Sequence, residues 1–302
     1  MALPETRASG TLAVMDATPP VPPAPGRFDP GVEIRVEGLH KAFDDHRVLR
    51  GIDLEIRSGE IVAIVGGSGC GKTVLLNHIL GQLKPDRGRV SVADHSQTPP
   101  ALKDIAGLDD QALCDVHTHW GVVFQRNALF SGSVLDNIAL WLSDIKNLSD
   151  EAIAPIARRV LAAVALPCDD AFLATPTESL SGGMAKRLAV ARALAMEPAV
   201  MFYDEPTTGL DPTSASQIQD LILATHAGSE SSAAAPARTT LIVTHDKDLL
   251  SRLEPRTVML HDGRVAFDGP FAGFKAATDP IIRPYFDLMP VLHQRAVVAA
   301  RP

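Results

Sequence analysis

The sequence predicts an α/β fold with parallel strands at its centre. Three continuous apolar runs, at residues 61–65, 199–203 and 241–243, are typical of strands that are buried on both faces of a sheet. Apolar residues recur at helical spacing between these runs, as expected when helices connect parallel strands. The chain has 302 residues and is 46% hydrophobic, which is enough for one large domain or two domains of ordinary size.

The first elements follow one another in a clear order. Residues 1–30 contain seven prolines and few bulky apolar side chains, so this leader is expected to be disordered. From Val32, apolar and polar residues alternate as in a half-buried strand, and the alternation resumes at residues 54–56. The buried strand at residues 61–65, a glycine-rich turn and a helical pattern that extends to Leu83 come next.

The second half of the chain is predicted to be helical before it returns to strands. Residues 132–195 show helical spacing and little strand pattern, which indicates a helical subdomain. Residues 227–238 are small and polar, as in a flexible surface loop. Residues 271–302 are divided by prolines and are predicted to form an appended C-terminal extension, with aromatic residues such as Phe274 and Tyr285 to bury.

Composition and charge exclude several function classes. Lys plus Arg total 28 against 36 for Asp plus Glu, and the two signs are interleaved, so no nucleic-acid partner is expected. The longest apolar runs are far shorter than the about 18 residues of a membrane span, and the N-terminus lacks a secretory signal, so a cytoplasmic protein is expected. The three cysteines, at positions 70, 114 and 168, suit a reducing compartment and give no zinc-binding pattern.

Residues 66–73 have the sequence of a phosphate-binding loop. The stretch Gly-Gly-Ser-Gly-Cys-Gly-Lys-Thr fits the pattern GxxxxGK followed by Ser or Thr, and it lies between a predicted strand and a predicted helix. Glycines allow successive backbone N–H groups to face phosphate oxygens, and the helix N-terminus adds positive potential. Lys72 is predicted to reach the β- and γ-phosphates, and Thr73 to ligate Mg²⁺. The alternative is a plain glycine-rich turn.

Asp204 and Glu205 supply the acidic partners that such a loop requires. They follow the apolar run at residues 199–203. Asp204 is predicted to bind Mg²⁺ through water, and Glu205 to act as the general base on the attacking water. In isolation, two exposed carboxylates at the end of a strand would be the simpler interpretation. The pairing with a phosphate-binding loop favours the catalytic one.

A third motif opens the helix that precedes this acidic strand. The stretch Leu180-Ser181-Gly182-Gly183-Met184 resembles the signature motif of ABC-type ATPases. Other residues match markers of that family in order: Phe43 resembles the adenine-stacking aromatic, Gln125 the Q-loop glutamine, Gly209-Leu210-Asp211 the D-loop and His245 the switch histidine. The resemblance implies a P-loop NTPase fold, an ABC-type nucleotide-binding domain over residues 31–270, with an antiparallel β subdomain and a helical signature subdomain.

The same resemblance implies that two copies of the chain share each nucleotide. Ser181 and the two glycine amides that follow it would form a second anion site at a helix start. Because the family's signature loop faces away from the phosphate loop of its own chain, a head-to-tail homodimer would hold ATP between Lys72 of one protomer and Ser181 of its partner. His245 would contact the γ-phosphate, and Gln125 would sense Mg²⁺ and link the site to the partner surface.

The predicted site residues form three sets, with ATP and Mg²⁺ as the implied cofactors. The catalytic set is Glu205, His245 and Lys72. The Mg²⁺ set is Thr73, Gln125 and Asp204. The ATP contacts are Phe43, Gly66, Gly67, Ser68, Gly69, Cys70, Gly71, Lys72, Thr73, Val74, Gln125, Ser181, Gly182, Gly183 and Asp211.

Other noticeable residues are expected to have structural roles. Trp120 and Trp141 are predicted to be packing residues, and Lys186-Arg187 is predicted to lie on a solvated helix face. His117 and His119 have the spacing of a metal-binding pair, but the sequence offers no third ligand beside them, so metal binding is not expected there.

A family member without membrane spans of its own drives a separate permease or performs a soluble task such as DNA repair. One nucleotide unit, and no sustained heptads between Lys72 and Ser181, favour transport. Residues 71–76, the blocks 124–130 and 134–138, and Met184 look like the Mla-type ATPases. Those ATPases power phospholipid transport between the inner and outer membranes of Gram-negative bacteria.

The Mla-type resemblance implies partners and a location. The partners are a membrane permease docked near residues 128–141, an MCE-domain lipid-binding protein and a STAS-domain protein. The ATPase would be peripheral, on the cytoplasmic face of the inner membrane. The extension at 271–302 resembles the tail of that group, which reaches across the dimer. The alternatives are the ATPase of an amino-acid or other small-solute importer and a soluble, non-transport ABC ATPase.

Overall fold

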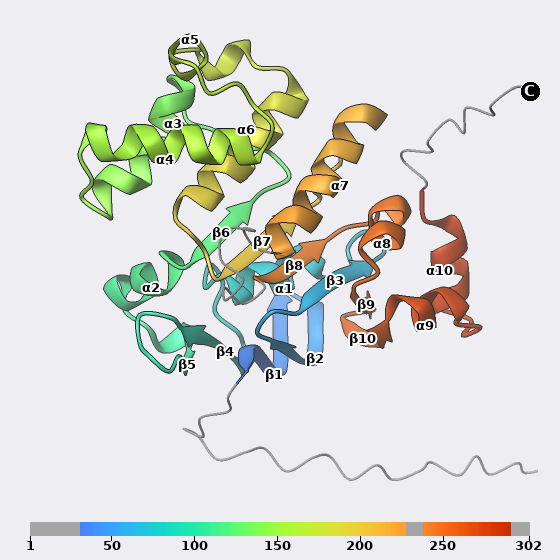
Figure 1. Cartoon of the computed structure of the whole chain (residues 1–302). Helices are drawn as coiled ribbons and strands as arrows, with labels where there is room; N and C mark the ends of the chain where they lie inside the picture. The colour runs from blue at the N-terminus through green and yellow to red at the C-terminus, as the bar shows by residue number, and fades with distance from the viewer. Residues whose placement is uncertain (1–30, 228–237, 291–302) are drawn as a thin grey trace, which may run out of the picture.

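The structure is a computed structural model that describes residues 31–227 and 238–290 (Figure 1). The predicted leader at residues 1–30, most of the predicted surface loop and residues 291–302 lie outside the described residues. A six-stranded sheet of order β10-β9-β3-β8-β7-β6 lies beside a four-stranded sheet of order β2-β1-β4-β5. Helices surround the larger sheet, so the predicted α/β fold is confirmed.

The larger sheet is parallel at its centre. Strands β9, β3, β8, β7 and β6 run parallel, and β10 pairs antiparallel with β9. The three predicted apolar runs form β3, β7 and β8, whose side chains are almost all buried, as the sequence predicts. The bounds are β3 (Ile61–Gly66), β6 (Trp120–Val123), β7 (Val200–Asp204), β8 (Thr239–Val243), β9 (Arg256–His261) and β10 (Arg264–Pro270).

The smaller sheet is antiparallel and contains the two predicted alternating segments. Its strands are β1 (Val32–Phe43), β2 (His46–Arg57), β4 (Arg87–Asp94) and β5 (Ala101–Asp104). Their buried side chains share one apolar cluster with helix α1 (Lys72–Ile79) and with β3. Helix α1 ends four residues before the predicted Leu83, because the chain turns at Gly81, whose φ is +71°.

In the sequence, a group of helices follows β6 and precedes β7, and in space this group lies apart from the smaller sheet (Figure 1). Its helices pack through an apolar core that includes Ile138, Leu161 and Leu188. The group begins with a capping box in which Ser133 and Asp136 exchange side-chain and backbone hydrogen bonds. The helices are α3 (Val134–Asp144), α4 (Asp150–Ala163), α5 (Asp170–Leu173), the 3₁₀ turn Thr177–Ser179 and α6 (Gly182–Ala195).

The remaining helices cover the central sheet. They are α2 (Asp110–His117), α7 (Pro212–Ala227), α8 (Lys247–Leu253), α9 (Phe271–Ala276) and α10 (Ile282–Leu288), with a 3₁₀ turn at Ile105–Gly107. Helices α9 and α10 belong to the predicted extension. Their Phe271, Phe274 and Phe286 share a cluster with Ala63 and Val65 of β3, so residues 271–290 pack on the central sheet.

The two tryptophans differ in their surroundings. Trp120 is 6% exposed and its ring lies 5.1 Å from that of Phe202, so its predicted packing role is confirmed. Trp141 is 40% exposed, so the same prediction is wrong for it. Within the described part of the chain, no helix combines the length and the apolar composition that crossing a bilayer requires.

Candidate active site

Three neighbouring parallel strands end together and place the predicted catalytic segments side by side. In the sheet, Ile64 of β3 and Asp204 of β7 each pair with Val243, the last residue of β8. The loops that follow these strands carry the phosphate-binding residues, Glu205 and His245. The carboxyl edge of a parallel sheet is the usual ligand site of such folds.

The phosphate-binding loop joins β3 to helix α1. Its first residue, Gly66, has a φ of +149°, and a Cβ there would lie 2.4 Å from the carbonyl oxygen of Leu260, so only glycine fits. Lys72 donates hydrogen bonds from Nζ to the carbonyl oxygens of Gly66 (2.8 Å) and Gly67 (3.1 Å). These bonds hold the ammonium group over the loop.

The rest of the loop is open to solvent where phosphate would approach it. Gly67, Ser68 and Gly69 are exposed, and Cys70 is half-buried. Gly71, at the N-terminus of α1, adopts a left-handed conformation with φ +105°. The first turn of the helix therefore presents Thr73, which is exposed, together with the half-buried Val74.

Glu205 and His245 form a direct pair. The Nδ1 atom of His245 lies 2.8 Å from Oε1 of Glu205, and the Thr208 hydroxyl donates to Oε2 at 3.3 Å. Glu205 has a left-handed backbone with φ +47°, which is uncommon for a residue with a side chain and often occurs at active sites. Both carboxylate oxygens are thus oriented, as the role of a general base requires.

Asp204 lies at the last position of β7, and its electrostatic surroundings are mixed. Burial raises the pKa of its carboxyl group, and the negative charge of Glu205 raises it further, while Lys186 and Lys72 lower it. A buried carboxyl group beside a second carboxylate is a favourable position for a divalent cation, which would offset both effects.

The oxygen donors at this edge fit Mg²⁺. Thr73 supplies a hydroxyl, Asp204 a carboxylate and Gln125 an amide, which are the ligand types that Mg²⁺ prefers beside substrate phosphates. Gln125 is exposed and follows the end of β6, which pairs with β7. The ion, when bound, would neutralise charge on the phosphates.

Phe43 lies at the end of β1, where the hairpin leads into β2. It is 42% exposed, and the hairpin that follows it brings Leu49 against Gly71, where a Cβ would lie 2.6 Å from Leu49 Cδ2. Phe43 thus offers an exposed aromatic ring on the hairpin that contacts the loop through Leu49, and its role in stacking on adenine stays a prediction.

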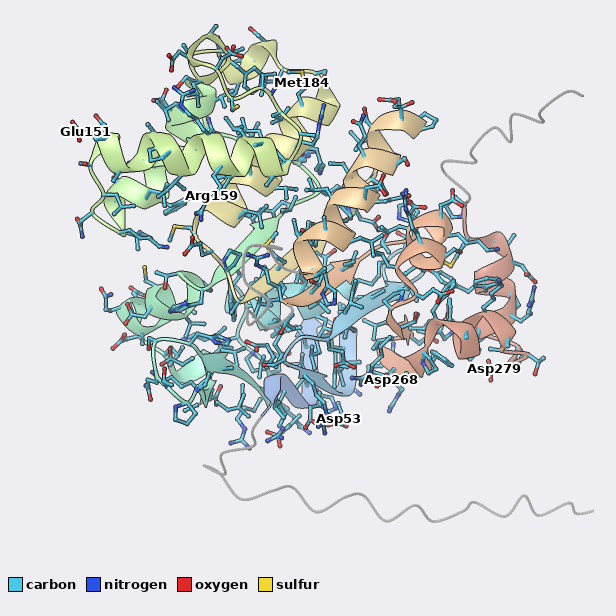
Figure 2. All side chains as sticks on the ribbon, in the orientation of Figure 1. Asp53, Glu151, Arg159, Met184, Asp268 and Asp279 are labelled. Atoms are coloured by element: carbon cyan, nitrogen blue, oxygen red, sulfur yellow. The ribbon has the colours of Figure 1, made fainter. Side chains whose placement is uncertain are left out.

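The signature residues lie elsewhere. Ser181 caps helix α6, and its Oγ accepts a hydrogen bond from the N–H of Met184 at 3.3 Å. Figure 2 shows Met184 among the upper helices, apart from the smaller sheet and the C-terminal helices. Gly182 is exposed, whereas a Cβ on Gly183 would lie 2.6 Å from the hydroxyl of Ser214. Asp211 is exposed, and its carboxylate caps the first turn of α7.

Lys186 contradicts the prediction of a solvated helix face. Its side chain is buried to 2% exposure, and Nζ donates to the carbonyl oxygens of Phe124 (3.1 Å) and Gln125 (2.9 Å). Burial lowers the pKa of Lys186 to about 8, with the charge of Asp204 acting in the opposite direction. Lys186 therefore ties the signature helix α6 to the segment that carries Gln125. A basic dipeptide at a helical position gives no local signal of such a contact.

Comparison with known proteins identifies the family. Residues 49–208 match the profile of a family described as ABC transporter. The chain belongs to the ABC transporter family. The matched segment includes the phosphate-binding loop, the signature motif and the strand that ends at Asp204.

Several relatives of this ABC protein carry different names. The chain is 34% identical over 268 residues to "Protein TRIGALACTOSYLDIACYLGLYCEROL 3, chloroplastic" of Arabidopsis thaliana, covering 85% of this chain and 74% of that protein. It is 32% identical over 261 residues to the probable ribonucleotide transport ATP-binding protein mkl of Mycobacterium tuberculosis, covering 86% and 68%. It is 33% identical over 240 residues to the histidine transport ATP-binding protein HisP of Pseudomonas aeruginosa, covering 78% and 90%.

Solved ABC structures have the same fold. One is cbiO1 from Clostridium perfringens, part of the ABC transporter complex cbiONQ, with a TM-score of 0.66 and 31% identity over 79% of this chain and 88% of that one. Another is the dimeric cassette MJ0796 bound to ADP and Pi after hydrolysis, with a TM-score of 0.65 and 28% identity over 78% and 98%.

Replacing Glu205 by Gln is expected to stop hydrolysis while leaving ATP binding intact. The amide keeps the shape of the side chain but cannot take a proton from water, so kcat should fall by about a hundredfold to ten-thousandfold. Steady-state phosphate release and equilibrium ATP binding measure the two properties. The matched control is Glu197→Gln, at an exposed carboxylate paired with Arg159. A Glu205→Gln variant that hydrolyses ATP at the wild-type rate would contradict the assigned base.

Replacing Lys186 by Met is expected to destabilise the chain. The change removes the donor to the partly buried carbonyl groups of Phe124 and Gln125, which costs about 1–3 kcal/mol of unfolding free energy. The shift of the urea midpoint at unchanged slope measures this loss. Lys186→Arg should recover part of it, because a guanidinium also donates hydrogen bonds. Lys84→Met, at an exposed lysine, is the control; equal midpoints for Lys186→Met and Lys84→Met would show that the buried contact contributes nothing.

Proposed function

We propose that this chain is the ATPase subunit of a phospholipid transporter and works as a homodimer beneath a separate membrane permease. The observation that carries the proposal is the similarity to the Arabidopsis protein named for trigalactosyldiacylglycerol, a membrane galactolipid, over 85% of this chain. The similarity to HisP, named for histidine transport, covers 78%. The similarity to mkl, named for ribonucleotide transport, covers 86%, so we infer the lipid from the Arabidopsis name and the Mla-type motifs together, and not from the share of the chain that is matched.

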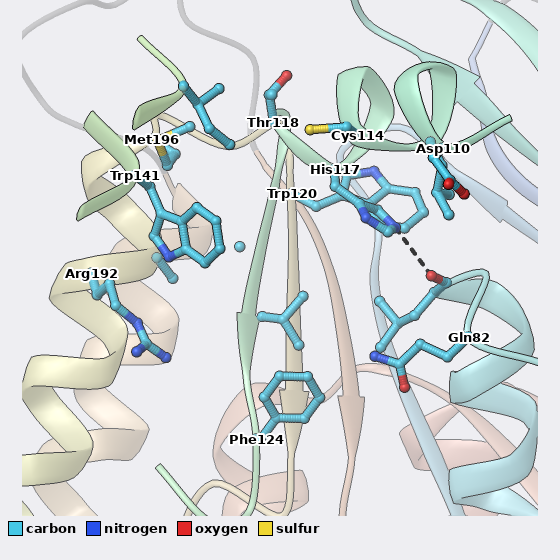
Figure 3. Close-up of a pocket in the computed structure, with 16 residues that line it drawn as sticks. Gln82, Asp110, Cys114, His117, Thr118, Trp120, Phe124, Trp141, Arg192 and Met196 are labelled. Atoms are coloured by element: carbon cyan, nitrogen blue, oxygen red, sulfur yellow. Dashed lines mark hydrogen bonds between the residues drawn. The ribbon is translucent and has the colours of Figure 1, made fainter. Parts of the chain in front are cut away.

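A cleft beside the proposed ATP site supports docking of the permease. It has a volume of about 470 Å³ and lies between the group of helices α3 and α6 on one side and β6, α1 and α2 on the other (Figure 3). Trp141, Trp120 and Phe124 line it, and apolar atoms dominate its walls, as is usual for a binding cleft. A helix or loop of the permease that carries apolar side chains fits this lining.

The cleft continues onto an exposed aromatic pair. Phe130 and Trp141 are 43% and 40% exposed, and their ring centroids lie 6.3 Å apart. The guanidinium of Arg192 lies 5.3 Å from the centre of the Phe130 ring. Exposed rings of this size in a soluble subunit mark an interaction surface. This surface falls within residues 128–141, where the permease is expected.

The mechanism follows from the position of the cleft. Phe124 lines the cleft, Gln125 is the next residue, and Lys186 binds the carbonyl groups of both. In the proposed homodimer, ATP binds more tightly to the closed form than to the open form, so ATP shifts the population towards closure and hydrolysis reverses the shift. The segment 124–125 would pass this change to the permease, which moves the lipid.

The proposed partners beyond the permease are an MCE-domain lipid-binding protein and a STAS-domain protein. The ATPase itself would lie on the cytoplasmic face of the inner membrane. The rival function is an amino-acid importer, which uses the same catalytic residues. Because the catalytic site is shared, only the partners and the bound cargo distinguish the two.

The deciding experiment isolates the complex from its native membranes. The Glu205→Gln variant is purified after detergent solubilisation, and copurifying proteins and lipids are identified by mass spectrometry. A permease with an MCE-domain protein and bound phospholipid is the expected result. A permease with a solute-binding protein would overturn the lipid substrate, and the absence of any membrane partner would overturn transport.

The docking cleft has its own test. Trp141→Asp places a charge on the exposed aromatic pair and is expected to reduce the copurified permease at least tenfold, since a buried interface does not accept an unpaired carboxylate. Ile281→Asp changes an apolar residue of similar exposure, 41%, at the N-cap of α10 and serves as the control. Equal recovery of the permease with both variants would place the docking site elsewhere.

A further inference from the structure

The C-terminal segment contacts the first residue of the phosphate-binding loop. The N–H of Gly66 donates a hydrogen bond to the hydroxyl oxygen of Tyr285, at 2.9 Å. Tyr285 belongs to α10, which is separated from the loop by more than two hundred residues of sequence. The bond therefore joins the far end of the described chain to the proposed ATP site.

The sheet itself leaves this N–H without a partner. The register between β3 and β8 ends at the pair Ile64 and Val243, and Ile64 accepts a hydrogen bond from Thr244 on that side. Successive residues of a strand direct their backbone N–H and C=O groups to opposite sides, so residues two apart direct them to the same side. The N–H of Gly66 therefore points to the same side as the carbonyl group of Ile64. There β8 has already turned away towards His245. Tyr285 supplies the acceptor that the missing strand would have provided.

Tyr285 is held in this position by packing. Its helix, α10, shares an apolar cluster with β3 through Ile282 and Phe286, and the ring centroid of Tyr285 lies 6.4 Å from that of Phe274 on α9. Burial raises the pKa of Tyr285 to about 12, so the hydroxyl stays neutral under physiological conditions. Its position is thus fixed by contacts that do not involve the nucleotide.

A second set of contacts joins the same helix to Lys247, at the start of α8. Lys247, two residues after His245, donates from Nζ to the carbonyl oxygen of Phe286 at 3.1 Å, and the same ammonium group lies 4.0 Å from the centre of the Phe286 ring. The backbone N–H of Lys247 also donates to the carbonyl oxygen of Pro290 at 3.4 Å. Residues 285–290 therefore contact both the phosphate loop and the loop that carries His245.

We propose that Tyr285 is a positioning residue of the ATPase, and that it fixes the start of the phosphate-binding loop before ATP arrives. The two faces of Gly66 are then held separately: its N–H by Tyr285 and its carbonyl oxygen by Lys72. A glycine with positive φ has little conformational preference of its own, so the loop depends on such anchors. If the hydrogen bond to Tyr285 is lost, the loop is less ordered before ATP binds. More conformational entropy is then lost on binding, and the affinity for ATP falls.

The proposal concerns ATP hydrolysis and does not depend on what is transported. It predicts that Tyr285→Phe, which removes one oxygen and keeps the packing, raises the KM for ATP and the Kd for ATP by about three- to tenfold, the range expected for one hydrogen bond. Lys72, Glu205 and His245 remain in the variant, so kcat should change less than KM.

Tyr203→Phe is the matched control. Tyr203 is the other tyrosine of the chain, and its hydroxyl makes a buried hydrogen bond of 3.0 Å to Thr225, on the helix α7 side of the sheet. Both variants lose one buried hydroxyl and should lose comparable stability. Only Tyr285→Phe should weaken ATP binding. An unchanged KM in Tyr285→Phe, or the same rise in Tyr203→Phe, would overturn the positioning role.

Amide hydrogen exchange of the full-length protein without nucleotide gives a readout independent of catalysis. In the wild type, the Gly66 amide is expected to be protected by its bond to Tyr285. In Tyr285→Phe, its exchange should accelerate at least tenfold, while that of Ile64, deeper in the same strand, should stay at the wild-type rate. Equal exchange of Gly66 in both proteins, or faster exchange of Ile64 as well, would show that Tyr285 does not hold the loop.

Discussion

The alignment of three parallel strands is the constraint on which the rest of the structure depends. β3, β8 and β7 are adjacent and end within two residues of one another, at Gly66, Val243 and Asp204. Because parallel strands have the same polarity, the loops that follow them emerge at one edge. The phosphate-binding loop, Glu205 and His245 meet there although they are far apart in sequence. A slip of the register would separate them, since each side chain would change faces.

The signature residues obey a different constraint. Ser181 begins a helix that packs with α3 and α4 in an apolar cluster continuous with β7 and α7, so its position relative to the phosphate loop depends on how that group of helices sits on the sheet. Lys186 is a buried tie across this boundary, because it joins α6 to the carbonyl groups at the end of β6. Burying an ammonium group lowers the stability of the fold unless the group is hydrogen-bonded. Lys186 therefore requires the carbonyl groups of Phe124 and Gln125 to stay within hydrogen-bond distance. In the proposed dimer, motion of the signature helix would therefore carry the Gln125 segment with it.

The sequence predicted the contiguous parts of the site and missed the parts made by distant contacts. The phosphate loop and the strand before Asp204 are local patterns, so the motif and the strand that carries it were found together. Lys186 was assigned wrongly because its burial depends on carbonyl groups about sixty residues away in the sequence. Trp141 was assigned wrongly because its exposure depends on how the neighbouring helices leave this part of the surface uncovered. The contact between Tyr285 and Gly66 spans the whole domain, and nothing in the residues around Tyr285 indicates it. The prediction from the sequence also misses β9 and β10; β10 has no buried side chain, whereas β9 contains a short run of four buried residues, three of them apolar.

The identity of the cargo is not encoded at the catalytic edge. Relatives named for a galactolipid, for ribonucleotide transport and for histidine transport are each about one-third identical to this chain. Proteins with a similar ATPase sequence are therefore named for different cargoes. The features that vary must then lie where the chain meets its partners. In this chain we propose the cleft lined by Trp141 and Phe124 as one such place, and the C-terminal helices form a second surface, which packs on β3. Each is joined to the ATP site by a specific hydrogen bond, from Lys186 to Phe124 and from Gly66 to Tyr285. A partner that binds at either surface can therefore shift residues beside the catalytic site through these hydrogen bonds. A difference in surface composition alone would not have this effect.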